Sequence, residues 1–331
     1  MIKTALLGAW HVHTDGFVQA FTEAGGTITA VWDEHETRGR EAAARYHASF
    51  EPDLPRILAQ PDIEAVLVES STTSHEEVIT AAAQAGKAIF TDKALTPDLA
   101  SSRRTADAVR AAGIPFMISL EAKSSALYQW VFDRIHRGEL GQVTSAFFRR
   151  SHQAAVEPML PSYWFDTSQT GGGITLDLGC HGLYLLPWLI GERPDRVQAS
   201  MRAPFDTGAD EISSTTMTFP GGAIASAHTS SAASQLDNTL EIVGTHASVQ
   251  ILGSRTEDAW IRFATPSGIE RIDPSSWTDA PLPSAVFADV LERRKPVPEA
   301  YSLQEALYLS EMIEAAYTSA EENRTVYTGR D

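Results

Sequence analysis

The sequence predicts an α/β protein in which a doubly wound parallel sheet is followed by an α+β domain with a large open, mostly antiparallel sheet. Over the first 120 residues, short apolar runs alternate with longer segments of helical period, which is typical of parallel strands joined by crossover helices. After about residue 140 the pattern becomes strand after strand, separated by turn signals such as Pro220-Gly221-Gly222. We therefore expect one domain at 1–120 and a second at 121–331, with a C-terminal helix that can pack back on the first.

The elements of the first domain follow from local patterns. Runs rich in Val, Ile, Phe and Thr predict strands, and the segments between them carry apolar residues at helical spacing. Gly86 and Gly113 come just after two of these helices, as C-terminal caps do. The strands are expected at 2–7, 27–32, 65–68, 88–91 and 116–119, and the helices at 17–24, 37–46, 75–85 and 100–112. A doubly wound sheet binds ligands at the carboxyl ends of its strands.

The second domain is predicted mainly from alternating apolar and polar residues. Such alternation indicates strands at 142–152, 195–202, 213–219, 223–230, 238–244, 247–253 and 260–264. Helical spacing predicts helices at 125–137, 174–190, 282–293 and 303–323. An open sheet normally buries its outer face against another subunit, because a large exposed apolar face favours aggregation. We therefore expect a homodimer or homotetramer.

Composition excludes several classes of partner. Asp and Glu number 43 against 26 Lys and Arg, and the resulting net charge of −17 repels nucleic acid and anionic membranes. Cys180 is the single cysteine, so neither an intramolecular disulfide nor a zinc site built from several cysteines can form, and a reducing compartment is indicated. No signal peptide and no run of about 18 apolar residues stands out. We expect a cytoplasmic protein that acts on a small molecule.

The turn after the first strand has the position of a dinucleotide-binding loop. In Gly8-Ala9-Trp10-His11-Val12-His13 only Gly8 matches the glycine fingerprint, so an ordinary strand-to-helix turn remains an alternative. Asp33 ends the second strand, where a carboxylate can accept hydrogen bonds from ribose hydroxyls and repel a 2′-phosphate. This position favours NAD over NADP, although a solvated carboxylate in a turn fits Asp33 equally well.

His11 and His13 could also donate two imidazoles to a metal ion. This alternative, a metal-dependent hydrolase in a barrel with Lys93, His75 or Asp177 as further ligands, fits badly, because a barrel needs eight strand-helix units. We therefore expect no metal.

The strongest pattern is Gly171-Gly172-Gly173 followed by Asp177 and His181. Four residues apart on a helix, these two side chains share a face, and a carboxylate beside an imidazole makes a plausible acid/base pair. A capping network around a buried histidine is an equally good interpretation. Lys93 ends the strand segment 88–91, at the edge where such a sheet binds ligands.

Nearly the whole chain resembles the Gfo/Idh/MocA oxidoreductase family. The resemblance lies in the order and spacing of several segments, which are 62–75, Ala85-Gly86-Lys87, Thr91-Asp92-Lys93, 138–143, 171–181, 240–245 and 306–326. It implies a Rossmann domain joined to a domain with a large open sheet, and NAD-dependent transfer of a hydride between a nicotinamide and a sugar, cyclitol or related polyol.

By position, the resemblance also implies roles for single residues. Lys93 resembles the family lysine that contacts the reacting hydroxyl, and Asp177 and His181 resemble its substrate-binding and acid/base pair. Cofactor contacts are expected at Gly8, Trp10, His11, Val12, Asp33, Ser70, Ser71, His75 and Lys93. Substrate contacts are expected at Glu121, Lys123, His152, Trp164 and Tyr184.

Four positions depart from the family pattern. Trp10 and His13 replace glycines, Ala94 replaces the proline after the lysine, and Tyr184 stands where many relatives have Asp. Tyr184 is expected to pack, as aromatic residues on an apolar helix do. A redox-assisted lyase or glycosidase and a non-catalytic sugar- or nucleotide-binding relative therefore remain alternatives to the dehydrogenase.

Overall fold

The computed structural model describes residues 2–329 and consists of two compact units, each formed by several chain segments. The first unit contains the chain up to Glu121 together with Ser168–Gly171 and Pro281–Ser310. The second contains Ala122–Thr167, Gly172–Ala280 and the chain from Glu311 onward. This partition differs from the division into 1–120 and 121–331 by two segments, which join the first unit because they pack on it.

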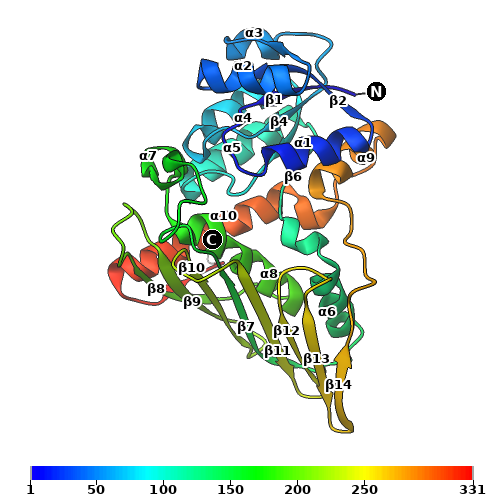
Figure 1. Cartoon of the computed structure of the whole chain (residues 1–331), viewed down its shortest axis with the longest axis vertical. Helices are drawn as coiled ribbons and strands as arrows, with labels where there is room; N and C mark the ends of the chain where they lie inside the picture. The colour runs from blue at the N-terminus through cyan, green and yellow to red at the C-terminus, as the bar shows by residue number, and fades with distance from the viewer. Residues whose placement is uncertain (1, 330–331) are drawn as a thin grey trace. The chain divides into compact units, whose positions relative to one another are not determined.

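The first unit is built on six parallel strands in the order β3-β2-β1-β4-β5-β6. Figure 1 labels β1, β2, β4 and β6 of this sheet. Their bounds are β1 Ile2–Leu7, β2 Gly26–Trp32, β3 Ser49–Phe50, β4 Ala65–Val68, β5 Ala88–Thr91 and β6 Phe116–Ile118. The helices between them are α1 Thr14–Glu23, α2 Glu36–Arg45, α3 Leu54–Leu58, α4 His75–Gln84 and α5 Leu99–Ala112. The predicted doubly wound parallel sheet is confirmed.

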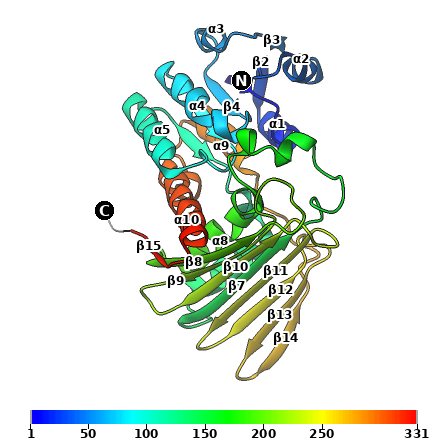
Figure 2. The same ribbon diagram turned by 90° about the vertical axis from the view of Figure 1, so that its left-hand side faces the viewer.

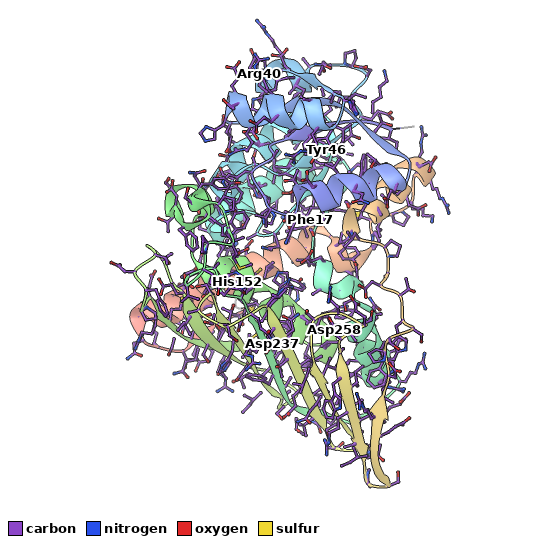
Figure 3. All side chains as sticks on the ribbon, viewed as in Figure 1. Phe17, Arg40, Tyr46, His152, Asp237 and Asp258 are labelled. Carbon is purple, nitrogen blue, oxygen red and sulfur yellow. The ribbon has the colours of Figure 1, made fainter. Side chains whose placement is uncertain are left out.

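Apolar layers on both faces hold this sheet. Every residue of β4 and β5 is buried, which explains why both read as continuous apolar runs. On one face, Phe17 (Figure 3) meets Phe90 edge to face, with ring centroids 5.5 Å apart. Phe287, from the late helix α9 Pro283–Arg293, packs on both Phe21 and Phe90. The segment from 281 is therefore part of the core of the first unit.

The second unit is built on nine strands in the order β14-β13-β12-β11-β7-β10-β9-β8-β15 (Figure 2). Their bounds are β7 Val143–Ser151, β8 Arg196–Arg202, β9 Ile212–Thr218, β10 Ile224–Ser230, β11 Asp237–Gly244, β12 Ser248–Leu252, β13 Trp260–Thr265, β14 Gly268–Ile272 and β15 Val326–Tyr327. Neighbouring strands are antiparallel except β7 and β10, which pair in parallel. The expected mostly antiparallel sheet is confirmed.

One face of this sheet is covered by helix α8, Cys180–Ile190, which packs on β7 and β10. The predicted single helix 174–190 is interrupted, because Thr175–Gly179 forms a π-helical turn before α8 begins. The outward residues of β9 and β10 are half-buried or exposed and mostly carry hydroxyl groups, as at Ser214, Thr216 and Ser226. The outer face is therefore more polar than the apolar face expected from the sequence.

The remaining helices are short or terminal. They are α6 Ala126–His136, α7 Thr167–Thr170, α10 Leu303–Glu322 and 3-10 turns at Thr72–Ser74, Glu121–Ser124, Ser162–Phe165 and Glu299–Tyr301. By length and composition the helical stretch Thr167–Ile190 could cross a membrane, but 72% of its apolar window is buried inside the structure, as in a core helix.

Candidate active site

The turn after β1 lies directly against the turn after β4. Gly8 has φ of 98°, and a Cβ there would lie 2.5 Å from the backbone N and Cα of Ser70. The backbone N–H groups of Trp10 and His11 both donate to the carbonyl oxygen of Glu69, at 2.9 and 3.4 Å. Gly8 is therefore required by close packing of two strand ends as well as by its backbone conformation.

Two predicted cofactor residues of this turn have very different exposures. Trp10 is buried, and its indole Nε1 donates to Oε1 of Gln169 at 3.1 Å. Val12 is 44% exposed. Trp10 therefore fills space within the first unit, where the fingerprint has a glycine.

Asp33 is buried at the end of β2, as predicted, and its carboxylate is fully hydrogen-bonded. Its oxygens accept the N–H groups of Ala9 and His35, both at 2.7 Å. Arg38 adds a two-pronged contact at 2.9 and 2.8 Å. This pairing with Arg38 was not predicted from the sequence, and a ribose hydroxyl bound at Asp33 would have to share the carboxylate with Arg38.

The loops after β4 and β5 are joined by His75. Its Nδ1 lies 3.0 Å from the carbonyl oxygen of Ala94 and its Nε2 lies 3.2 Å from that of Ser70. Burial lowers the pKa of His75. Both His75 nitrogens thus face backbone oxygens, and the ring fixes the loop that carries Lys93.

Ser71 contacts the turn after β2, because its hydroxyl donates to the Glu34 carboxylate at 2.8 Å.

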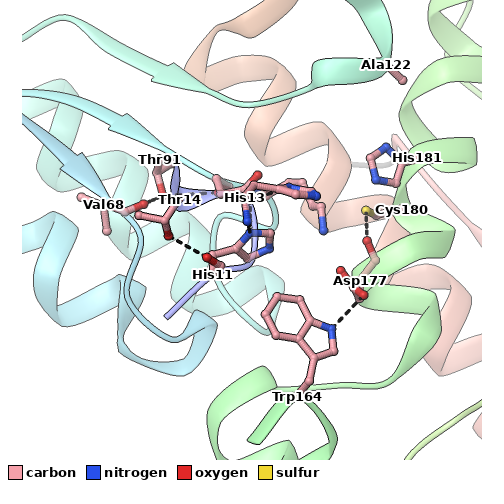
Figure 4. A network of polar contacts seen from close by, with 12 residues as sticks. His11, His13, Thr14, Val68, Thr91, Ala122, Trp164, Asp177, Cys180 and His181 are labelled. Atoms are coloured by element: carbon pink, nitrogen blue, oxygen red, sulfur yellow. Dashed lines mark hydrogen bonds and ion pairs between the residues drawn. The ribbon is translucent and has the colours of Figure 1, made fainter. Parts of the chain in front are cut away.

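Asp92 and Lys93 follow β5, and both are buried. Oδ2 of Asp92 lies 2.7 Å from Nδ1 of His11 and 3.3 Å from Nδ1 of His13. The two imidazole rings are labelled in Figure 4. Burial alone would raise the pKa of the Asp92 carboxyl, but the two imidazoles hold it well below its usual range. This carboxylate stays ionised in the interior. The peptide bond between Lys93 and Ala94 is cis.

The two histidines respond differently to the same carboxylate. Burial lowers the pKa of His11, and Asp92 does not fully offset it. For His13 burial also lowers the pKa, but Asp92 and the predicted substrate residue Glu121 outweigh burial and raise the net pKa. His13 is the more exposed of the two, with 31% of its side chain accessible.

Glu69 is a second buried carboxyl at the same edge of the sheet. It follows β4 and is 0% exposed. Burial and the Asp92 charge raise the pKa of Glu69 well above its usual value. Two carboxyls whose pKa values are driven apart are typical of functional sites. Sequence reasoning missed Glu69 and Asp92, although an acidic residue just after a buried strand was visible in both places.

In the second unit, Asp177 lies in the π-helical turn and His181 in α8. The prediction of two side chains four residues apart on one regular helix is therefore wrong in its geometry, because the wider turn changes the angle between them. Asp177 Oδ2 accepts the indole N–H of Trp164 at 3.0 Å (Figure 4). Trp164, predicted to contact substrate, is buried and orients the Asp177 carboxylate.

His181 is held by Tyr184 one turn further along α8. Nδ1 of His181 lies 2.7 Å from the Tyr184 hydroxyl, which also accepts the backbone N–H of Ala122 at 3.1 Å. The buried ammonium of Lys123 lies 5.8 Å above the Tyr184 ring. Tyr184 was expected to pack or to contact substrate, and in the structure its hydroxyl fixes one nitrogen of the histidine.

The glycines before this turn make room for protein atoms. A Cβ at Gly172 would lie 2.7 Å from the Tyr317 hydroxyl, and a Cβ at Gly173 would lie 2.4 Å from Asp210. Asp210 accepts hydrogen bonds from the N–H and hydroxyl of Thr175 at 2.8 and 2.5 Å, and from Tyr317 at 2.8 Å. Asp210 therefore anchors the start of the π-helical turn.

His152, also predicted to contact substrate, has its Nδ1 engaged locally. It accepts the backbone N–H of Ala154 at 3.2 Å, and the ring is buried at the end of β7.

The first unit fits a nicotinamide dinucleotide at two positions of the fingerprint. Gly8 provides the tight turn after β1, and the buried carboxylate of Asp33 ends β2. Trp10 and His13 depart from the pattern, but the Trp10 indole is buried within the unit and bonded to Gln169.

Two family models match most of the chain. The model described as oxidoreductase family, NAD-binding Rossmann fold, matches residues 1–120. The model of the GFO/IDH/MocA C-terminal domain matches residues 128–250.

Individual relatives are more distant. A 1,5-anhydro-D-fructose reductase of Ensifer adhaerens is 24% identical over 253 residues, 75% of each protein. A trans-1,2-dihydrobenzene-1,2-diol dehydrogenase of Bos taurus is 25% identical over 239 residues, 68% of this chain and 66% of the relative.

Solved structures show the same fold at low sequence identity. A levoglucosan dehydrogenase in complex with NADH and levoglucosan has a TM-score of 0.87 at 20% identity and covers 99% of this chain and all of its own. An aldose-aldose oxidoreductase from Caulobacter crescentus, complexed with glycerol, has a TM-score of 0.85 at 20% identity, covering 98% of this chain and 99% of its own. With a Rossmann unit and a C-terminal sheet unit that both match, the chain belongs to the Gfo/Idh/MocA family of NAD-binding oxidoreductases.

Proposed function

We propose that the protein is an NAD-dependent dehydrogenase that transfers a hydride between a hydroxyl-bearing carbon of a sugar, cyclitol or related polyol and the nicotinamide. Family membership and relatives named as sugar dehydrogenases and reductases support this assignment. When bound, NAD supplies the hydride acceptor or donor. The chain itself must bind the polyol and move the hydroxyl proton.

The observation that carries the proposal is the contact between His181 and Tyr184. An alcohol that loses a hydride must also lose its proton, which requires a base within hydrogen-bond reach. Nδ1 of His181 lies 2.7 Å from the Tyr184 hydroxyl oxygen. In our proposal Nδ1 carries the proton of the neutral ring and donates to that oxygen, so that the lone pair of Nε2 accepts the substrate proton. Asp177 orients the substrate, and Lys93 stabilises the developing alkoxide.

Calorimetric titration with NADH and NADPH tests the cofactor assignment. We expect NADH to bind with micromolar affinity and NADPH at least about 10-fold more weakly, since Asp33 repels a 2′-phosphate. The variant Asp33→Asn should weaken NADH binding, whereas Asp62→Asn, an exposed position paired with Lys3, should leave it unchanged. Absence of NADH binding would remove the dehydrogenase assignment. If a set of polyols is converted to products without net formation of NADH, the result would instead indicate a redox-assisted lyase.

We also propose that the outer face of the nine-stranded sheet joins subunits in a homodimer or homotetramer. Its central strands expose a broad row of hydroxyl side chains that a second copy can cover. Light scattering at micromolar concentration should give two or four times the chain mass of 35.9 kDa. Thr216→Arg, a charge in the middle of this face, should shift the mass toward the monomer, and a wild-type monomer would refute the proposal.

A further inference from the structure

Three neighbouring strands of the first unit bring four ionisable side chains to one edge of the sheet. His11 and His13 follow β1, Glu69 follows β4 and Asp92 follows β5. Because β1, β4 and β5 are adjacent and parallel, their carboxyl ends meet at this edge. The proposed dehydrogenase reaction uses none of these four residues to move a proton.

The donor atoms of three of these residues converge. One ring nitrogen of His11, one ring nitrogen of His13 and a carboxylate oxygen of Asp92 all lie within 4.8 Å of one another. The other oxygen of Asp92, Oδ1, accepts the backbone N–H of Lys93 at 2.7 Å, so Oδ2 is the atom directed at both imidazoles. Two imidazole nitrogens and one carboxylate oxygen are a donor set that suits divalent transition metals.

The contacts around Asp92 show how one metal ion could use all three residues. Oδ2 of Asp92 lies 2.7 Å from Nδ1 of His11 and 3.3 Å from Nδ1 of His13. Without a metal ion, a proton on each imidazole nitrogen satisfies these contacts as hydrogen bonds. A single divalent ion could replace these protons and take the two nitrogens and Oδ2 as its ligands.

Glu69 adds a buried carboxyl at the same edge of the sheet. Its side chain is completely buried, and within the part of the chain that the structure describes neither carboxyl oxygen makes a hydrogen bond of normal geometry. A buried polar group without such a bond is costly to maintain. A divalent cation bound beside Glu69 would stabilise its ionised form and lower this cost.

We propose that His11, His13 and Asp92 bind a divalent transition-metal ion such as Zn²⁺, with Glu69 as the buried carboxylate beside it, contrary to the expectation from the sequence that no metal is bound. The buried ring of His11 and the buried carboxylate of Asp92 form the closed side of the site. The partly exposed His13 ring forms its open side, where water or another oxygen ligand completes the coordination.

Titration of metal into chelator-treated protein without an affinity tag tests the proposal. We expect one Zn²⁺ per chain by calorimetry, and a visible absorption band when Co²⁺ is used as the probe. His13→Gln should weaken binding by more than about 10-fold, and Asp92→Asn should do the same. His35→Gln is the matched control, because His35 is exposed in the same unit and lies outside the cluster.

His13→Gln is the decisive variant because its partly exposed ring can be replaced without opening the core. Thermal melting should show that the metal-free variant unfolds close to the wild-type temperature, and that Zn²⁺ raises the melting temperature of wild type and His35→Gln only. Wild-type protein that binds no Zn²⁺, or binding that is equal in His13→Gln and His35→Gln, would overturn the proposal. NADH titration of the same samples measures the dehydrogenase assignment separately.

Discussion

Replacing Lys93 by Met is expected to lower kcat by about 10²- to 10⁴-fold, the range for loss of a positioned proton-transfer or charge-stabilising group. The long apolar side chain of Met preserves much of the packing of the buried lysine stem. The loss should therefore appear in turnover of the best substrate from the polyol panel, with a smaller change in KM. His181→Asn should have a similar effect, because it removes the proposed proton acceptor.

Lys87→Met is the matched control for this measurement. Lys87 is another buried lysine of the first unit, but its ammonium donates to the carbonyl oxygens of Gln60 and Ile63, both at 2.8 Å. Its replacement should lower stability and leave kcat per folded molecule within about threefold of wild type. If Lys93→Met kept kcat within the same range, Lys93 would have no part in the chemistry.

Gly8→Ala is expected to destabilise the first unit by about 3 kcal/mol. The added Cβ would lie 2.5 Å from the Ser70 backbone, and overpacking of this kind costs about 1–3 kcal/mol. The φ of 98° adds about 1–2 kcal/mol for a residue with a side chain. Denaturant unfolding measures the sum, and NADH affinity should fall with it because the displaced turn is the one that faces the cofactor in this fold.

Gly113→Ala separates the two contributions. Gly113 also has positive φ, 63°, but a Cβ there would meet no atom within 4 Å. This variant should therefore lose only the conformational part, about 1 kcal/mol. Equal losses at Gly8 and Gly113 would contradict the steric argument.

The sequence predicted the features that depend on local pattern. The buried strands of the first unit, Asp33 at the end of β2 and Lys93 after β5 all follow from apolar runs and from residues that come directly after them. The second-unit pair Asp177 and His181 was found by its spacing, but the π-helical turn between them was not, because a single inserted residue leaves no clear trace in helical periodicity.

What remained hidden depends on contacts between segments distant in sequence. The placement of Asp92 between two imidazoles needs the register of β1 against β4 and β5. The role of Tyr184 needs the backbone N–H of Ala122, 62 residues away. The parallel pairing of β7 with β10 could not be read from alternation, which is the same for both strand directions.

The late segment that contains Phe287 has a consequence for synthesis of the chain. Its ring packs on Phe21 and Phe90, so both side chains lack this contact until the ribosome has synthesised the helix Pro283–Arg293, although Phe90 also packs on Phe17. During synthesis, the first unit therefore stays incomplete while strands β7 to β14 of the second unit are being made. Truncation after residue 121 would leave the same apolar surface open, and a separately expressed first domain should aggregate unless the helix Pro283–Arg293 is supplied.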